Sequence, residues 1–227
     1  MRRTRNGRGR RPDPGLAARR REEILDAAAP LFARSGYPDA DLQELADRLG
    51  LAKGTLYLYF PSKEALFLAA VDRGMRRLRA HVEAACAGIA DPLQRLTAAI
   101  RAYLEFFREH PDQAELLIIE RAEFRDRKCP TYLEHREAHR DEWREVFAGL
   151  IRCGRVRDIP PDRILDVIGD LLYGTMFTNH FRCRHSPLDA QVRDVTDILF
   201  HGILAPGRAG REVCPGENSD ASGQSVS

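Results

Sequence analysis

Apolar residues recur every three or four positions along most of the chain, which is the spacing of an amphipathic α-helix. Leu, Ala, Arg and Glu dominate these stretches, whereas Val, Ile and Thr are scattered. The pattern therefore predicts an all-α fold of about nine helices. We expect them at about residues 16–35, 41–49, 52–59, 62–87, 92–110, 111–127, 131–154, 161–182 and 188–205.

Glycine, proline and aspartate mark the ends of several of these helices. Gly36 follows the first helix and Gly50 the second, and glycine adopts the positive φ of a helix stop without a steric cost. Asp41, with a glutamate three residues later, has the capping-box pattern at the start of the second helix. Asp91, followed by proline, supplies an N-cap for the fifth helix.

The two ends of the chain differ in composition from the helical part. Residues 1–15 combine Arg, Gly and Pro, and residues 206–227 are rich in Gly, Ser, Pro and Ala, so we predict a disordered basic arm and a disordered tail. The arginines between residues 2 and 21 are opposed only by Asp13, although the net charge of the whole chain is only +2. This local charge attracts a polyanion, and its sign alone does not distinguish nucleic acid from an anionic membrane surface.

The composition excludes several classes of protein. Apolar residues make up 43% of the 227 residues, which is enough for a core, so wholesale disorder is excluded. No run approaches the ~20 consecutive apolar residues of a membrane-spanning helix, so we expect no membrane partner. The 5 cysteines form no C-x-x-C pair, and no apolar stretch follows the basic start. Both features favour reduced thiols in a cytoplasmic protein without a secretory signal.

Residues 41–60 have the pattern of a helix-turn-helix. Gly50 permits a tight turn, and the apolar residues around it are spaced to pack across the corner: Leu45, Ala46, Leu49, Leu51 and Leu56. The exposed side of the second helix carries small or hydrogen-bonding residues that suit entry into a major groove: Lys53, Gly54, Thr55 and Tyr57. Tyr59 and Lys63 follow where they could hold backbone phosphates. The alternative is that Tyr57 and Tyr59 are packed aromatics and Lys63 is merely solvated.

The same region resembles the tetracycline-repressor (TetR/AcrR) family. The resemblance spans about residues 19–71 and lies in residues 24–28, 31–32, 36–37, 45–46, 50–51 and 54–66. It implies an all-helical homodimer with an N-terminal DNA-binding domain, here 16–62, and a C-terminal domain for a small effector, here 63–205. The family's DNA-contact positions correspond to Gln43, Lys53, Gly54, Thr55, Tyr57, Tyr59 and Lys63. Ala52 stands where the family often has a capping serine, and the missing cap should cost roughly 1 kcal/mol of local stability.

The last two predicted helices are the candidates for a homodimer interface. The helix over 161–182 is apolar nearly all round, and the next one carries a narrower stripe of Leu188, Val192, Val195, Ile198, Leu199 and Ile203. Together they suit a four-helix contact between two copies, as the resemblance also implies, and Gly169 and Gly174 would permit a close crossing. Packing within one chain is the alternative.

Aromatic and polar residues of the C-terminal half suggest a mainly apolar cavity with a few polar groups, the usual form of a small-molecule site. The candidates are Tyr103, Phe106, Phe107, Trp143, Phe147, Tyr173, Met176, Phe177, Asn179 and His180. Any one of them can equally be a core residue. We expect a hydrophobic or aromatic effector and no cofactor.

Metal-dependent and catalytic functions have less support. His135 with His139, and His180 with Cys183 and His185, have the spacing of metal ligands, but the first pair fits a solvated charged face better, and we expect no metal. The sequence holds no G-x-S-x-G, Walker loop, H-E-x-x-H or dinucleotide fingerprint, so we do not expect an enzyme.

The sequence therefore predicts a ligand-responsive transcriptional regulator, taken as a repressor, that binds a palindromic operator in double-stranded DNA as a dimer. A small, mainly hydrophobic effector would release it. The alternative function is that of a helical sensor or scavenger protein whose basic arm binds anionic surfaces non-specifically.

Overall fold

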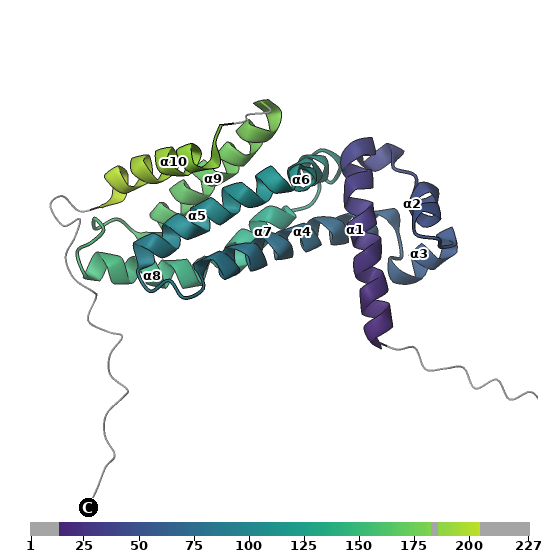
Figure 1. Cartoon of the computed structure of the whole chain (residues 1–227), viewed down its shortest axis with the longest axis horizontal. Helices are drawn as coiled ribbons and strands as arrows, with labels where there is room; N and C mark the ends of the chain where they lie inside the picture. The colour runs from purple at the N-terminus through teal and green to yellow at the C-terminus, as the bar shows by residue number, and fades with distance from the viewer. Residues whose placement is uncertain (1–13, 183–185, 205–227) are drawn as a thin grey trace, which may run out of the picture. The chain divides into compact units, whose positions relative to one another are not determined.

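The computed structural model describes residues 14–182 and 186–204. Residues 1–13 of the predicted arm, the predicted tail, Cys183 and His185 lie outside these ranges. Within them the chain forms ten helices and no strand beyond an isolated bridge between Val156 and Leu204, which confirms the all-α prediction (Figure 1). None of these helices is long and apolar enough to span a bilayer.

The helices follow the predicted order, except that one predicted helix is split into two. They are α1 (Pro14–Asp39), α2 (Leu42–Arg48), α3 (Lys53–Tyr59), α4 (Lys63–Cys86), α5 (Pro92–Glu109), α6 (Pro111–Glu123), α7 (Thr131–Ala138), α8 (Arg140–Arg152), α9 (Pro161–Arg182) and α10 (Leu188–Ile203). The helix predicted over 131–154 is two helices, because the backbone of His139 (φ −119°, ψ 8°) leaves the helical region. Within α1 the helix is interrupted at Gly36, whose φ is 73°.

The described residues form two compact units. One contains residues 14–74 and 115–126, and the other contains the remainder. This division differs from the predicted domains, which separate at residue 62 and place 115–126 with the C-terminal part. The helices α4 and α6 each contribute residues to both units.

Aromatic packing explains why 115–126 joins the first unit. The ring of Phe124, directly after α6, lies 4.9 Å from that of Tyr37 and 5.4 Å from that of Phe67, centroid to centroid. Phe67 in turn packs edge-on at 5.1 Å against Phe32, which is fully buried in α1. These four rings pack together in one core. Because Phe67 belongs to α4 and Phe124 follows α6, the core of the first unit extends beyond α1 to α3. Burial, and then the nearby Glu64 carboxylate, raise the pKa of Tyr37.

An arginine on α4 also fixes α1 within the first unit. Arg73 Nε lies 2.5 Å from Glu22 Oε2, and Arg73 Nη2 lies 2.7 Å from Asp26 Oδ1. The Arg73 side chain is only 14% exposed, so both pairs are partly shielded from solvent. Shielded pairs keep a more fixed geometry than fully solvated ones. This arginine therefore links the position of α4 to that of α1.

The second unit is a helical bundle in which α5 and α10 lie side by side (Figure 1). α9 packs against α5 and α8. The predicted stripe of α10 is buried here, except for Ile198: the buried residues are Leu188, Val192, Val195, Leu199 and Ile203. Asp91 caps α5 by accepting a hydrogen bond from the Gln94 N–H at 3.1 Å, as predicted.

The three cysteines within the described ranges differ in oxidation state. Cys86 and Cys129 carry free thiols, and burial raises the pKa of the Cys86 thiol. Cys153 is in a disulfide bond. The prediction of reduced thiols is therefore wrong for Cys153.

Candidate functional site

The helix-turn-helix predicted over 41–60 is formed by α2 and α3. Asp41 caps α2 by accepting a hydrogen bond from the Gln43 N–H at 2.7 Å, and Gly50 forms the turn with a φ of 64°. The Leu51 N–H closes the turn by donating to the Ala46 carbonyl at 2.9 Å. Leu56 is the one buried residue of α3, so this side chain anchors the helix and leaves its other faces outward.

The residues predicted to contact DNA fall into two groups. Gln43, Lys53, Gly54 and Tyr57 are exposed, whereas Thr55, Tyr59 and Lys63 are half-buried. A Cβ added at Gly54 would meet nothing within 4 Å, so the α3 backbone is open to close approach there. Tyr57 is 43% exposed, so its side chain is not buried in the core of this unit. Ala52, as predicted, makes no side-chain cap at the start of α3.

Some of these residues already have partners within the chain. Lys63 Nζ donates to the Pro38 carbonyl at 2.8 Å and lies 5.3 Å above the centre of the Tyr37 ring. An ammonium has three donors, so Lys63 can keep this bond and still bind a phosphate. Gln43 Nε2 donates to Asp47 Oδ1 at 2.7 Å, and the Lys53 ammonium lies 3.7 Å from Asp41 Oδ1. Both of the latter contacts are exposed and are therefore easily exchanged for contacts with a ligand.

Sequence reasoning missed Leu58 and Arg21. Leu58 is 84% exposed on α3, beside Tyr57 and one turn after Gly54. Helix periodicity gives the signal for it, because a residue two positions after the buried Leu56 faces the opposite side of the helix. Arg21 of α1 donates to the Tyr59 carbonyl at 3.0 Å and lies over the Phe60 ring at 4.2 Å, which brings a guanidinium to the end of α3.

The second unit holds a cavity of about 260 Å³. Its apolar lining comes from α4, α5, α8 and α9: Met75, Leu78, Val82, Leu96, Ala99, Ile100, Trp143, Phe147, Leu165, Ile168 and Leu172. Two tyrosines, Tyr103 and Tyr132, also line it, and charged side chains and two histidines complete the wall. The cavity thus has the form of a small-molecule site, with an apolar surface and a few polar groups.

Three of the ten predicted effector residues line this cavity: Tyr103, Trp143 and Phe147. The other seven are not among its lining residues: Phe106, Phe107, Tyr173, Met176, Phe177, Asn179 and His180. Phe106 and Phe107 are buried in the bundle beside each other, 5.4 Å between centroids. Asn179 and Gln191 of α10 exchange two amide hydrogen bonds of 2.9 Å, so Asn179 holds α9 to α10. The C-terminal half of α9 therefore mainly packs against the neighbouring helices and contributes little to the cavity lining.

The two cavity tyrosines form a hydroxyl pair. Their oxygens lie 3.0 Å apart, and Tyr103 Oη also lies 3.8 Å from Met176 Sδ. Burial raises the pKa of both phenols, that of Tyr103 well above its ordinary value. Both are consequently neutral hydrogen-bonding groups near pH 7.

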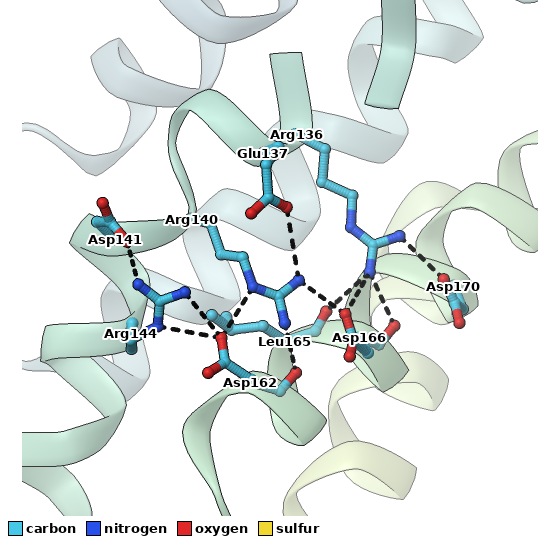
Figure 2. A network of polar contacts seen from close by, with 9 residues as sticks. All are labelled: Arg136, Glu137, Arg140, Asp141, Arg144, Asp162, Leu165, Asp166 and Asp170. Atoms are coloured by element: carbon cyan, nitrogen blue, oxygen red, sulfur yellow. Dashed lines mark hydrogen bonds and ion pairs between the residues drawn. The ribbon is translucent and has the colours of Figure 1, made fainter. Parts of the chain in front are cut away.

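An ion-pair network joins α7 and α8 to α9 along one wall of the cavity. Figure 2 shows the arginines at four-residue spacing, Arg136, Arg140 and Arg144, facing aspartates at the same spacing, Asp162, Asp166 and Asp170. Arg140 Nε lies 2.9 Å from Asp162 Oδ1, and its Nη1 lies 2.7 Å from Asp166 Oδ1. Hydrogen bonds from Arg144 and Arg140 hold the pKa of Asp162 below its ordinary value, and one from Arg140 does the same for Asp166.

One of the histidines considered as metal ligands, His139, has a backbone partner for its ring. His139 Nδ1 lies 2.7 Å from the His135 carbonyl oxygen, so this nitrogen donates. Within the described ranges no group of three or more His, Cys, Asp or Glu side chains is arranged to hold a metal ion.

Two family models match the chain. One describes bacterial regulatory proteins of the tetR family and matches residues 24–70. The other describes the tetracyclin repressor-like C-terminal domain and matches residues 90–176. The first match contains all the predicted DNA-contact residues, and the second contains most of the cavity lining.

Individual proteins and structures agree with these matches. The transcriptional activator FasR of Mycolicibacterium smegmatis is 41% identical over 101 residues, which cover 44% of this chain and 46% of that protein. The chain thus spans about half the length of this curated relative. The fatty acid degradation regulator FadR of Bacillus halodurans superposes with a TM-score of 0.66 at 20% identity, covering 80% of this chain and 98% of that one. The ketosteroid regulator KstR2 of Mycobacterium tuberculosis gives 0.60 at 25% identity, covering 82% and 95%.

Proposed function

Because the chain belongs to the tetR family of bacterial regulatory proteins, we propose that it is a ligand-responsive repressor of transcription that binds double-stranded DNA. The observation that carries the proposal is the presentation of α3. Leu56 and the Gly50 turn hold this short helix firmly, while Gly54, Tyr57 and Leu58 face outward. A helix that is anchored on one side and bare on the other is what insertion into a major groove requires.

A second copy of the chain completes the DNA-binding surface. On α9, Val167 and Phe181 are 62% and 67% exposed, and Leu171 is at 36%. Ile198 of α10 is 70% exposed, although the rest of its stripe is buried. Apolar side chains exposed on two adjacent helices support a contact between two copies of the same face. Such a dimer presents two α3 helices about a dyad, and this arrangement reads a palindrome.

The cavity of the second unit is the effector site. Met75 and Leu78 of α4 line it, and Arg73, at the preceding turn of the same helix, holds Glu22 and Asp26 of α1. A ligand that changes the position of α4 therefore has a covalent route to the helix-turn-helix. In such a dimer, the distance between the two α3 helices must match the distance between the two half-sites of the DNA. An effector that binds more tightly to a dimer with a different distance lowers the affinity for DNA, because the two binding equilibria are linked.

Selection of bound sequences from a random DNA pool by the full chain tests this function. We expect a palindrome, also present in DNA flanking the chain's own gene, and loss of most specific affinity in Tyr57→Ala. Leu133→Ala is the control, because Leu133 on α7 is 40% exposed, much as Tyr57 is. Binding without sequence preference, or equal binding by Tyr57→Ala, would favour the scavenger alternative instead.

A further inference from the structure

Two buried hydroxyls of the cavity wall are hydrogen-bonded to each other. Tyr103 on α5 and Tyr132 on α7 are 8% and 7% exposed, and their oxygens lie 3.0 Å apart. The second contact of the Tyr103 hydroxyl is the Met176 thioether at 3.8 Å. A thioether is a weak acceptor, so this contact satisfies the hydroxyl poorly.

The proton count of this pair leaves one donor for a ligand. Two hydroxyls carry two protons, and only one of these can lie between the two oxygens. When Tyr132 donates to Tyr103, the second proton is that of Tyr103, and its acceptor is the weak Met176 sulfur. When Tyr103 donates to Tyr132, the second proton belongs to Tyr132. An oxygen acceptor in the cavity therefore gains a hydrogen bond and displaces only a weak one.

The charged side chains of the wall are already engaged. Arg79 pairs with Glu83 at 2.5 Å, and Glu142 pairs with Arg95. Arg136 and Arg140 pair with the aspartates of α9 at 2.7–2.9 Å. A carboxylate or phosphate would compete with these acidic side chains for the arginines and be repelled by Glu83 and Glu142, whereas an uncharged ligand leaves the pairs intact.

From these contacts we propose that the effector is a compact, uncharged, mainly apolar molecule with one oxygen acceptor, such as a ketone, that binds the Tyr103–Tyr132 pair. The cavity volume of about 260 Å³ is just below the roughly 300–1,000 Å³ of sites for drug-sized ligands, which selects a compact molecule. This inference rests on the proposed function, because it takes the cavity to be the effector site.

Matched probes test the inference on the full chain without DNA. Three sets share a skeleton and differ in the head group: 2-acetylnaphthalene, 2-ethylnaphthalene and 2-naphthoate; acetophenone, ethylbenzene and benzoate; and acetylcyclohexane, ethylcyclohexane and cyclohexanecarboxylate. Calorimetry should show that the ketone of at least one set binds about threefold to tenfold more tightly than its hydrocarbon. The carboxylate should bind most weakly.

Phenylalanine variants identify the hydrogen bond. The double variant Tyr103→Phe, Tyr132→Phe, which lacks both hydroxyls, should remove the preference for the ketone and leave hydrocarbon binding unchanged. Tyr173→Phe is the matched control and should keep the preference, because the Tyr173 ring lies tilted at 4.6 Å from that of Tyr132, centroid to centroid, but does not line the cavity.

Three outcomes would overturn the inference: tightest binding of a carboxylate, a ketone preference that survives in the double variant Tyr103→Phe, Tyr132→Phe, or no binding of any ketone. Each leaves the proposed function standing if the chain still selects a palindrome. Conversely, a chain that binds ketones in this way but selects no DNA sequence would overturn the proposed function and retain the inference.

Discussion

The guanidinium of Arg136 lies directly against the backbone of Gly169. A Cβ at position 169 would stand 2.6 Å from Arg136 Nε, closer than atoms of this kind can approach. From this position Arg136 reaches Asp170 at 2.9 Å and Asp166 at 3.4 Å. The absence of a side chain at Gly169 therefore gives space to an arginine of the same chain, rather than to the close helix crossing expected from the sequence.

Gly169→Ala should force the Arg136 guanidinium away from α9. Alanine in a helix normally gains about 0.5–1 kcal/mol over glycine, and we expect the displacement of Arg136 to cancel this gain. Gly202→Ala on α10 is the control, because a Cβ there meets nothing within 4 Å, and it should show the full gain. Denaturant unfolding measures both. Equal stabilisation by the two substitutions would show that the Arg136 contact contributes nothing.

Acid should weaken the network between α8 and α9. The arginines lower the pKa of Asp162 and Asp166 in the folded state below the ordinary 3.8, so the unfolded chain binds protons first. Their contribution to stability is complete above that value and is lost as the pH falls through the lower, folded values.

The double variant Asp162→Asn, Asp166→Asn tests this dependence. Its thermal unfolding midpoint should lie below that of the parent at pH 7, and the difference should shrink towards pH 3. Asp158→Asn, in the segment before α9, should behave like the parent at both pH values. A gap that stays constant down to pH 3 would contradict the assignment.

The network shows what sequence patterns can and cannot predict. The four-residue spacing of its arginines and aspartates is visible in the sequence, but only the structure shows that the two stripes face each other. The break at His139 had no glycine or proline to signal it. By contrast, the α2 cap at Asp41 and the turn at Gly50 were predicted because local backbone chemistry determines them.

Leu58 should contribute to sequence recognition. Its exposed side chain is suited to contact a thymine methyl group, so Leu58→Ala should weaken binding to the selected site about fivefold to tenfold. Folding stability and binding to random DNA should not change, because the side chain is 84% exposed. Fluorescence anisotropy titrations with both DNAs measure this, and Leu133→Ala serves as the control. An equal loss on random DNA would make Leu58 a non-specific contact.

The cavity lining was harder to predict than the DNA-binding helix. Which aromatic residues reach a cavity depends on the rotation of each helix in the bundle, and tertiary packing sets this rotation. Tyr103 and Phe107 are one turn apart on α5 and both are buried, yet only Tyr103 lines the cavity. The sequence pattern marks both residues as internal and cannot separate them.

Ile198→Glu should separate the proposed dimer. Placing a carboxylate in an apolar symmetric contact introduces two charges at once, so the dimer dissociation constant should rise about a hundredfold or more. Analytical ultracentrifugation at micromolar concentration measures this, with Leu16→Glu on α1 as the control for an exposed apolar site. A parent chain that sediments as a monomer would remove the dimer from the proposal.

Chemical probing of the selected DNA site tests the insertion of α3 most directly. Dimethyl sulfate modifies guanine N7, which lies in the major groove, and adenine N3, which lies in the minor groove. With the full chain bound, we expect two patches of protected guanine N7 on a dyad, about one helical turn or a multiple of it apart, and no protection in Tyr57→Ala. Protection confined to adenine N3, or a single patch without symmetry, would contradict the insertion of two α3 helices into the major groove.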